Sequence, residues 1–147
     1  MLKEKIQQDV KDALKSGDTR KRMVLGMVMA AIKNKEIEKH GELTDEEVVA
    51  VISSEIKKRK DSVVQFEKGG RPELAEQEKE EAKILMEYMP EQMSEDEIRA
   101  EVQKAIRETG AKDVKEMGKV LGVLMPKVKG KADGQTVSRI VKEKLST

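Results

Sequence analysis

Residues 23–32, MVLGMVMAAI, form the longest apolar run in a chain of 147 residues. A membrane-spanning helix needs about 20 apolar residues, so this run is too short to cross a bilayer. Leu, Met and Ala favour helices, and a helix that is apolar on every side is normally buried in a core. We therefore expect the central helix of a bundle over about residues 19–39. Met23, Met27 and Met29 are expected to fill the core rather than line a binding groove.

Residues typical of helix ends divide the rest of the chain into separate expected helices. Residues 44–47 (TDEE) and 94–97 (SEDE) match the capping box at the start of a helix, and Pro72 suits the first turn of another. Apolar residues recur with helical spacing between these signals and predict an all-α fold. The expected helices cover about residues 2–16, 19–39, 44–68, 72–89, 95–109, 114–126 and 135–145.

Pro90 marks the expected boundary between two domains. Proline interrupts a helix because it lacks the amide hydrogen that the helical hydrogen bond needs. The capping box at 94–97 starts a new helix directly afterwards. We therefore expect an N-terminal four-helix domain at 1–90 and a C-terminal three-helix domain at 91–147.

The composition excludes several classes of site. The chain has no cysteine, so it has no disulfide, no thiolate metal site and no cysteine nucleophile. Phe66 and Tyr88 are the only aromatic residues, so the cores must be aliphatic. The charged start of the chain reads as a helix rather than a secretory signal. On these grounds we expect a cytoplasmic protein.

The motifs predict no catalytic, metal or cofactor site. His40 is the only histidine, and it stands at an expected helix end, where the helix dipole favours a solvent-exposed histidine. The many glutamates stand among lysines at spacings typical of a solvated helix surface, and no glycine-rich phosphate loop is present. The basic runs at 20–22 and 57–60 are likewise expected to be solvated, with contact to a partner as the less favoured alternative.

The last quarter of the chain is strongly basic. Residues 112–147 contain nine basic and four acidic side chains, although the whole chain carries a net charge of only +1. Such an offset is typical of a protein with a polyanionic partner. Gly118 and Gly122 lie one helical turn apart in this segment. Because two helical glycines together cost about 1.5–2 kcal/mol, we expect another helix to pack closely against them.

Three lysines follow Pro126, where we expect the chain to leave the helix. Lys127, Lys129 and Lys131 stand at alternate positions, so in an extended loop they project to one side. Three like charges in five residues repel one another unless a counter-charge is bound, which favours a phosphate-binding edge. A solvated linker between two helices remains the alternative.

The segment at 117–134, together with 30–37, 55–62 and 88–92, resembles the YqeY-like family. The resemblance covers essentially the whole chain, with Gly134 as a departure because related tails often have proline there. It implies two helical domains, the second of which is similar to the GatB/YqeY tail domain of the B subunit of the tRNA-dependent Asp/Glu amidotransferase. That enzyme is a carbon–nitrogen ligase with glutamine as amido-N-donor, and its tail is a tRNA-binding appendage.

From this resemblance we expect a tRNA-binding accessory protein related to the amidotransferase but without an active site of its own. The amidation chemistry sits in a domain of the enzyme that the resemblance does not cover, so stand-alone activity is not expected. The near absence of aromatic residues implies RNA contact through phosphates and shape rather than through stacked bases. The expected tRNA-contact residues are Lys112, Lys115, Gly118, Lys119, Gly122, Lys127, Lys129, Gly130 and Lys131. The alternative is a protein–protein adaptor that uses the N-terminal helices and binds no RNA.

Overall fold

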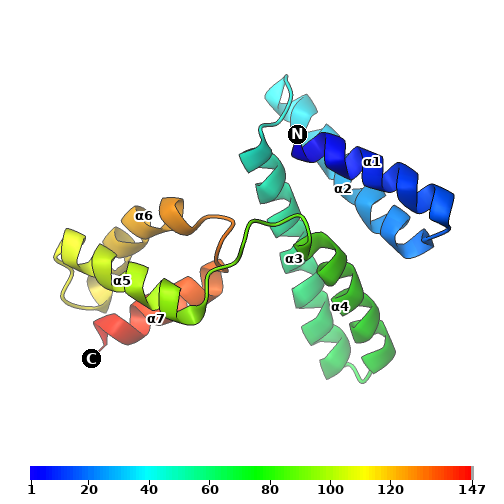
Figure 1. The fold of residues 1–147 in the computed structure, drawn as a ribbon. Helices are drawn as coiled ribbons and strands as arrows, with labels where there is room; N and C mark the ends of the chain where they lie inside the picture. The colour runs from blue at the N-terminus through cyan, green and yellow to red at the C-terminus, as the bar shows by residue number, and fades with distance from the viewer. Residues whose placement is uncertain (147) are drawn as a thin grey trace. The chain divides into compact units, whose positions relative to one another are not determined.

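The computed structural model describes residues 1–146, and within them the fold is all-α, as expected (Figure 1). The described residues contain seven α-helices, one short 3-10 helix and no strand. The helices are α1 (Leu2–Ser16), α2 (Thr19–Lys39), α3 (Asp45–Lys68), α4 (Pro72–Met86), α5 (Glu95–Thr109), η1 (Val114–Glu116), α6 (Met117–Val128) and α7 (Gly134–Leu145).

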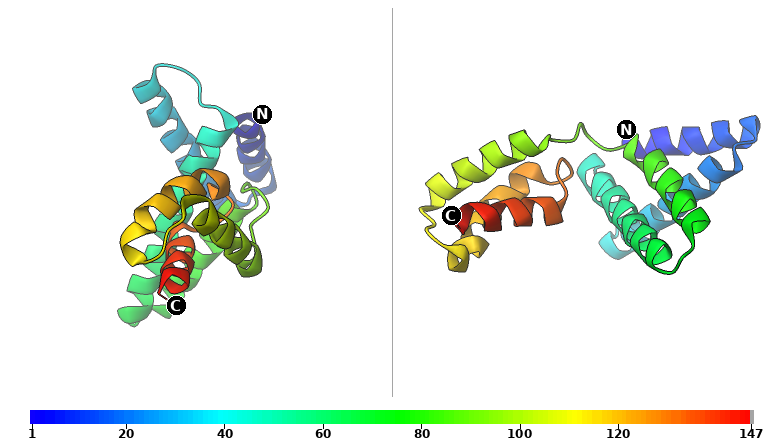
Figure 2. Two further views of the ribbon diagram at one scale, coloured as in Figure 1. Left: turned by 90° about the vertical axis from the view of Figure 1, so that its left-hand side faces the viewer. Right: turned by 90° about the horizontal axis from the view of Figure 1, so that it is seen from below.

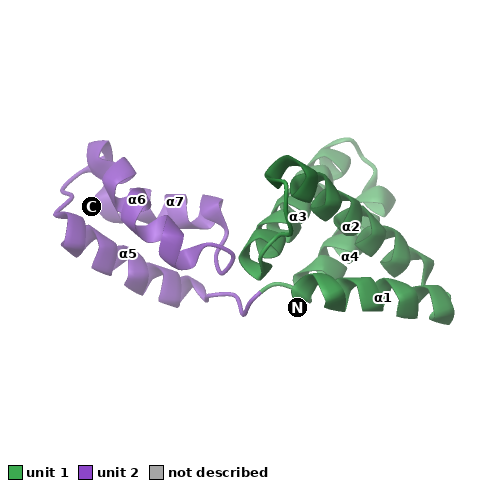
Figure 3. Ribbon diagram, turned by 90° about the horizontal axis from the view of Figure 1, so that it is seen from above, with its two compact units in different colours: residues 1–89 green, residues 90–147 purple. Residues whose placement is uncertain are grey.

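Contacts along the chain group these helices into two compact units (Figure 3). The first unit is Met1–Met89 and contains α1 to α4, and the second begins at Pro90 and contains α5 to α7. Each unit has its own apolar core. The candidate site described below lies entirely within the second unit.

Two helical hairpins build the first unit, α1 with α2 and α3 with α4 (Figures 1 and 2). Their ends are fixed locally: Thr44 and Glu47 form the expected capping box of α3, and Pro72 occupies the first turn of α4. The core between the hairpins is aliphatic, with Tyr88 as its aromatic member, whose hydroxyl donates a hydrogen bond of 2.5 Å to Asp9 Oδ2. The fully buried larger side chains of this core are Ile6, Val24, Leu25, Val28, Ile32, Val48, Ile52 and Leu85.

The expectation that α2 is buried on all sides is wrong. Its bounds are as expected, but α1, α3 and α4 cover only the side that carries its four fully buried aliphatic residues. On the other side Met23 and Met27 are 59% and 52% exposed, whereas Met29 is half-buried against the core. The three other helices of the unit pack against one side of α2 and leave the other in solvent. Met23 and Met27 therefore do not fill the core.

The second unit contains α5, α6 and α7 around a separate aliphatic core. The α5 helix starts with the expected capping box of Ser94 and Glu97 and ends at Gly110, which has a left-handed φ of 68°. The non-helical segment before α5 is tied to the loop before α7, because Met93 N–H donates to the Lys131 carbonyl at 2.8 Å. The buried residues of the core are Ile98, Val102, Ala105, Ala111, Val120, Leu124, Val128, Val137, Ile140, Val141 and Leu145.

The expected exit from the helix at Pro126 is wrong, because α6 continues to Val128 with the proline inside its last turn. Pro126 has no N–H, so the carbonyl of Gly122 receives no helical hydrogen bond from it. Both residues are exposed, and water can satisfy that carbonyl, which is why the proline is tolerated there. Burial of Val128 against the core keeps the last turn helical beyond the proline.

Candidate nucleic-acid interface

The nine expected tRNA-contact residues all lie on or beside α6. Lys112 precedes η1 and Lys115 lies in it, whereas Gly118, Lys119, Gly122 and Lys127 belong to α6 itself. Lys129 is the C-terminal cap of α6, and Gly130 and Lys131 lead toward α7. All nine are exposed except Gly130, which is half-buried. The structure therefore divides them between the two ends of one helix.

At the amino-terminal end of α6 stands a group of lysines without acidic partners, Lys112, Lys115 and Lys119, here called the α6 lysine cluster. No ion pair within residues 1–146 involves any of them. The nearby Asp113 carboxylate is occupied in capping η1, where it accepts a hydrogen bond of 3.0 Å from Lys115 N–H. The amino-terminal end of a helix carries partial positive charge, which adds to that of the three ammonium groups.

Gly118 and Gly122 face open space rather than another helix. A Cβ atom placed on either residue has no neighbouring atom within 4 Å apart from its own helix backbone and chain neighbours. The expected close helix packing is therefore wrong. The buried side of α6 is formed by Val120, Leu124 and Val128, so the two glycines point outward. They leave a strip of bare helix backbone beside Lys115 and Lys119.

The lysines at the other end of α6 do not form the expected extended, one-sided row. Lys127 lies in the last helical turn, and its Nζ is 3.4 Å from Glu108 Oε2. Lys129 has a ψ of 125° and Gly130 a left-handed φ of 79°, so the chain changes direction between Lys127 and Lys131. Lys127 is therefore less available to a bound phosphate than the α6 lysine cluster, whereas Lys129 and Lys131 make no ion pair within residues 1–146.

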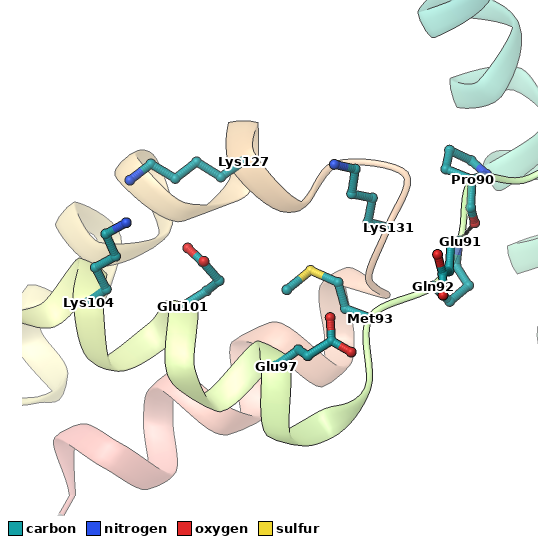
Figure 4. A pocket seen from close by; sticks show the side chains of 9 residues that line it. All are labelled: Pro90, Glu91, Gln92, Met93, Glu97, Glu101, Lys104, Lys127 and Lys131. Carbon is teal, nitrogen blue, oxygen red and sulfur yellow. Dashed lines mark hydrogen bonds between the residues drawn. The ribbon is translucent and has the colours of Figure 1, made fainter.

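A shallow pocket of about 560 Å³ separates the carboxyl-terminal end of α6 from α5. Lys104 and Glu101 of α5 lie across the pocket from Lys127 of α6, and Lys131 lies farther along the wall (Figure 4). Glu97 also lines the pocket, so its charges are mixed. Lys104 was not among the expected residues, because in the sequence it is one charged residue among many on the surface of a helix.

The basic run at 57–60 contains a buried residue that the sequence did not reveal. Arg59 is almost fully buried, whereas Lys57, Lys58 and Lys60 are exposed as expected. A signal was present, since Arg59 stands one turn after Glu55 and in phase with the buried Ile52 and Ile56. We nevertheless expected Arg59 to be solvated, because it is charged and stands in a basic run.

No metal site or membrane-spanning helix is found in the described part of the chain. Among residues 1–146, no group of three or more His, Cys, Asp or Glu side chains is arranged to hold a metal ion. None of the helices there is long and apolar enough to cross a membrane. His40 is the exposed cap at the end of α2 and has a left-handed φ of 62°.

Residues 3–145 match the family of YqeY-like proteins. The chain belongs to this family. The match spans both compact units and confirms the resemblance that residues 30–37, 55–62, 88–92 and 117–134 indicated.

Curated relatives in yeasts are named altered inheritance of mitochondria protein 41, mitochondrial. The protein of Kluyveromyces lactis is 38% identical over 84 residues, which are 56% of this chain and 45% of the relative. That of Lachancea thermotolerans is 33% identical over 106 residues, 70% of this chain and 57% of the relative. That of Saccharomyces cerevisiae is 35% identical over 82 residues, 55% of this chain and 44% of the relative. The matched part of this YqeY-like chain thus spans about half the length of these relatives.

The same names contradict the expected cytoplasmic location. Several of the relatives are named as mitochondrial proteins. The expectation rested on the absence of cysteine and on a charged, non-secretory start. Neither feature distinguishes one reducing compartment from another, because import is directed by targeting segments and not by the composition of a folded domain.

Proposed function

We propose that this YqeY-like protein is a tRNA-binding accessory protein without an active site of its own, related to the glutamine-dependent tRNA amidotransferase through its tail domain. The observation that carries the proposal is the α6 lysine cluster. Three lysines stand within eight residues around a helix amino terminus and make no ion pair within the described residues. A row of phosphates supplies the missing counter-charge.

The exposed glycines support a nucleic-acid partner in particular. Gly118 and Gly122 let a sugar–phosphate strand approach the helix backbone more closely than any side chain allows. The Gly122 carbonyl, which receives no bond from Pro126, is an acceptor for a ribose 2′-hydroxyl. That hydroxyl is the group by which proteins distinguish RNA from DNA.

Each of the two units is assigned a different kind of binding partner. We assign RNA contact to the C-terminal three-helix domain at 91–147 and assign any protein contact to the N-terminal four-helix domain at 1–90. Phe66 and Tyr88 both belong to the N-terminal domain, so the RNA-binding domain has no aromatic ring on which a base could stack. Binding then depends on phosphate charge and shape, and it is strongly sensitive to salt.

Fluorescence anisotropy with a labelled tRNA transcript tests the proposal. If three to five phosphates are neutralised, the logarithm of the association constant falls against the logarithm of the salt concentration with a slope of about −2 to −5. We expect the variant with glutamate at positions 112, 115 and 119 to lose most of the binding. Glutamate at 127, 129 and 131 should weaken it less, and glutamate at 57, 58 and 60 is the matched control in the other unit.

The alternative function is that of a protein–protein adaptor that binds no RNA. The exposed apolar side chains of Met23 and Met27 are the observation in its favour. If all three triple variants bind tRNA as the parent chain does at moderate salt, the RNA proposal fails and the adaptor takes its place. Steady amidation of misacylated tRNA by the purified chain, lost on a single substitution, would contradict both.

A further inference from the structure

The solvent side of α2 carries an uncharged, mainly apolar strip that the other helices of the first unit leave exposed, apart from the contact of Arg59 with Met27 Sδ. Its members, here called the α2 stripe, are Met23, Gly26, Met27, Ala30, Asn34 and Ile37. Ile37 is 62% exposed at one end and Met23 is 59% exposed at the other. Charged residues make up 40% of the chain, yet none falls within this strip. An exposed apolar surface of this kind typically marks a contact with another molecule.

Packing inside the unit does not account for the stripe. Val24, Leu25, Val28 and Ile32 on the opposite side of α2 already bury completely against the core. A Cβ atom placed on Gly26 meets nothing within 4 Å outside its own helix. Beside Ala30 the surface is hollowed into a groove of about 410 Å³ that Lys3, Gln7, Met29, Lys33 and Glu36 also line.

The spacing of the stripe is that of a helix–helix contact. Met23, Ala30 and Ile37 recur every seven residues, and Met27 and Asn34 recur at the same interval. A seven-residue repeat keeps one strip of a helix against a partner helix over several turns. The small residues Gly26 and Ala30 lie near the middle of the strip, where they permit the two helix axes to approach closely.

We infer that the α2 stripe is the interface of a homodimer, in which α2 packs antiparallel against α2 of a second copy with the two-fold axis at Ala30. In this arrangement Ala30 faces Ala30, and Met23 of each copy faces Ile37 of the other. An interface between identical copies must be complementary to itself under a two-fold rotation. Met23 and Ile37 satisfy that condition at the two ends and Ala30 at the centre, while Gly26 lies opposite Asn34 and Met27 opposite Lys33 of the other copy.

The charges beside the stripe satisfy the same symmetry. Arg20 and Glu38 are 18 residues apart, which is five helical turns, so both flank the stripe on the same side. In the antiparallel pair Arg20 of one copy faces Glu38 of the other. Both pairs, Met23 with Ile37 and Arg20 with Glu38, are centred within one residue of Ala30. That shared centre is why we assign the stripe to a second copy and not to an unrelated helix or a lipid surface.

Within one copy these two charges have only exposed partners. Arg20 pairs with Glu80, and Glu38 Oε2 is 3.5 Å from Lys35 Nζ. Exposed ion pairs of this kind contribute little and exchange readily. Reorientation of both side chains toward a second copy therefore costs little free energy. A single helix pair with one ion pair at each end makes a small contact, so the dimer should be weak and depend on concentration.

Analytical ultracentrifugation of the full chain over a concentration series tests the dimer. We expect a reversible monomer–dimer equilibrium that Ala30→Glu weakens by at least about 100-fold, since it places two carboxylates against each other at the axis. Leu14→Glu is the matched control, because Leu14 is also an exposed apolar residue and lies on α1 outside the stripe. Circular dichroism confirms that each variant keeps its helices.

A charge exchange tests the antiparallel arrangement itself. Arg20→Glu and Glu38→Arg should each weaken the dimer by about 5-fold. The double variant restores the opposite charges across the interface and should recover the parental affinity. Recovery supports the arrangement, whereas additive loss in the double variant overturns it.

A single-cysteine variant reports on the axis directly. Because the chain has no cysteine, Ala30→Cys under mild oxidation should form a disulfide-linked dimer, whereas Gln8→Cys on α1 should not. The inference is overturned if the chain stays monomeric at every concentration and Ala30→Cys remains unlinked. It is overturned equally if the α2 stripe binds anionic vesicles while the protein stays monomeric. RNA binding through α6 is unaffected by either result.

Discussion

Arg59 and Glu55 lie one turn apart on α3, and both side chains are buried, with exposures of only 6% and 9%. Arg59 Nη1 is 3.7 Å from Glu55 Oε1 and donates a hydrogen bond of 3.1 Å to the Glu55 carbonyl. Its Nε is 3.6 Å from Glu81 Oε1 of α4, too far for a hydrogen bond, and has no other partner in the described residues. Its Nη2 reaches Met27 Sδ of α2 at 3.8 Å. One guanidinium thus connects three helices of the first unit.

We expect Arg59→Ala to be among the most destabilising substitutions in the first unit. It removes the buried cation beside Glu55 and leaves that carboxylate with only the exposed Lys58, whose Nζ is 3.1 Å from Glu55 Oε2. The free energy of unfolding should fall by about 3 kcal/mol. Lys60→Ala is the matched control on the same basic run, because Lys60 is exposed, and it should change stability by no more than about 0.5 kcal/mol. Urea unfolding of both variants measures the difference. Equal effects would mean that the buried cation adds nothing to the fold.

Gly118→Ala and Gly122→Ala should each stabilise the second unit while weakening RNA binding. Both glycines are helical and face open space, so alanine relieves about 0.5–1 kcal/mol of chain entropy without a clash. Its methyl group also holds a nucleic-acid strand away from the helix backbone. Gly110→Ala is the contrasting control and should destabilise, because Gly110 has a φ of 68°. Thermal unfolding and tRNA anisotropy on the same samples separate the two effects.

Acid should weaken the start of α3 through Glu47. Hydrogen bonds from Lys39 Nζ at 2.5 Å and from Thr44 N–H at 3.0 Å lower the pKa of Glu47 to about 2. A carboxyl group whose pKa is lower in the folded chain stabilises it fully above the ordinary value near 4.5. This contribution is lost as the pH falls from about 4.5 toward 2.

Unfolding by urea at pH 7 and at pH 3 measures the effect. Glu47→Gln should be less stable than the parent at pH 7 and should close most of that gap at pH 3. Glu46→Gln is the control, because Glu46 is an exposed neighbour in the same first turn. A gap between Glu47→Gln and the parent that stays constant with pH would contradict the assignment.

Limited proteolysis should first cut the chain near Met89–Glu91. This segment lies between the two units and outside any helix, whereas Gln92 and Met93 are bonded to the loop before α7. We expect two fragments that each keep their helical circular dichroism. A first cut inside α3 would show that the two units do not fold separately.

The sequence by itself determined where most helices begin and end. The capping boxes of Thr44 with Glu47 and Ser94 with Glu97 formed as expected, and α2 covers the expected residues. These features depend on hydrogen bonds between residues three or four apart, so a short window of sequence contains what they need. The all-α class follows from the same local signals.

Only the tertiary structure decided which side of each helix is buried. The run at 23–32 is apolar all round, so its sequence has no periodicity that indicates which side is buried. Contacts with α1, α3 and α4 determine the buried side. Packing between helices likewise determines that Arg59 is buried and that Gly118 and Gly122 point outward. A helix forms from neighbours along the chain, but its buried side is set by residues far apart in sequence. Local patterns therefore predicted the helices, and packing decided which of their residues another molecule can reach.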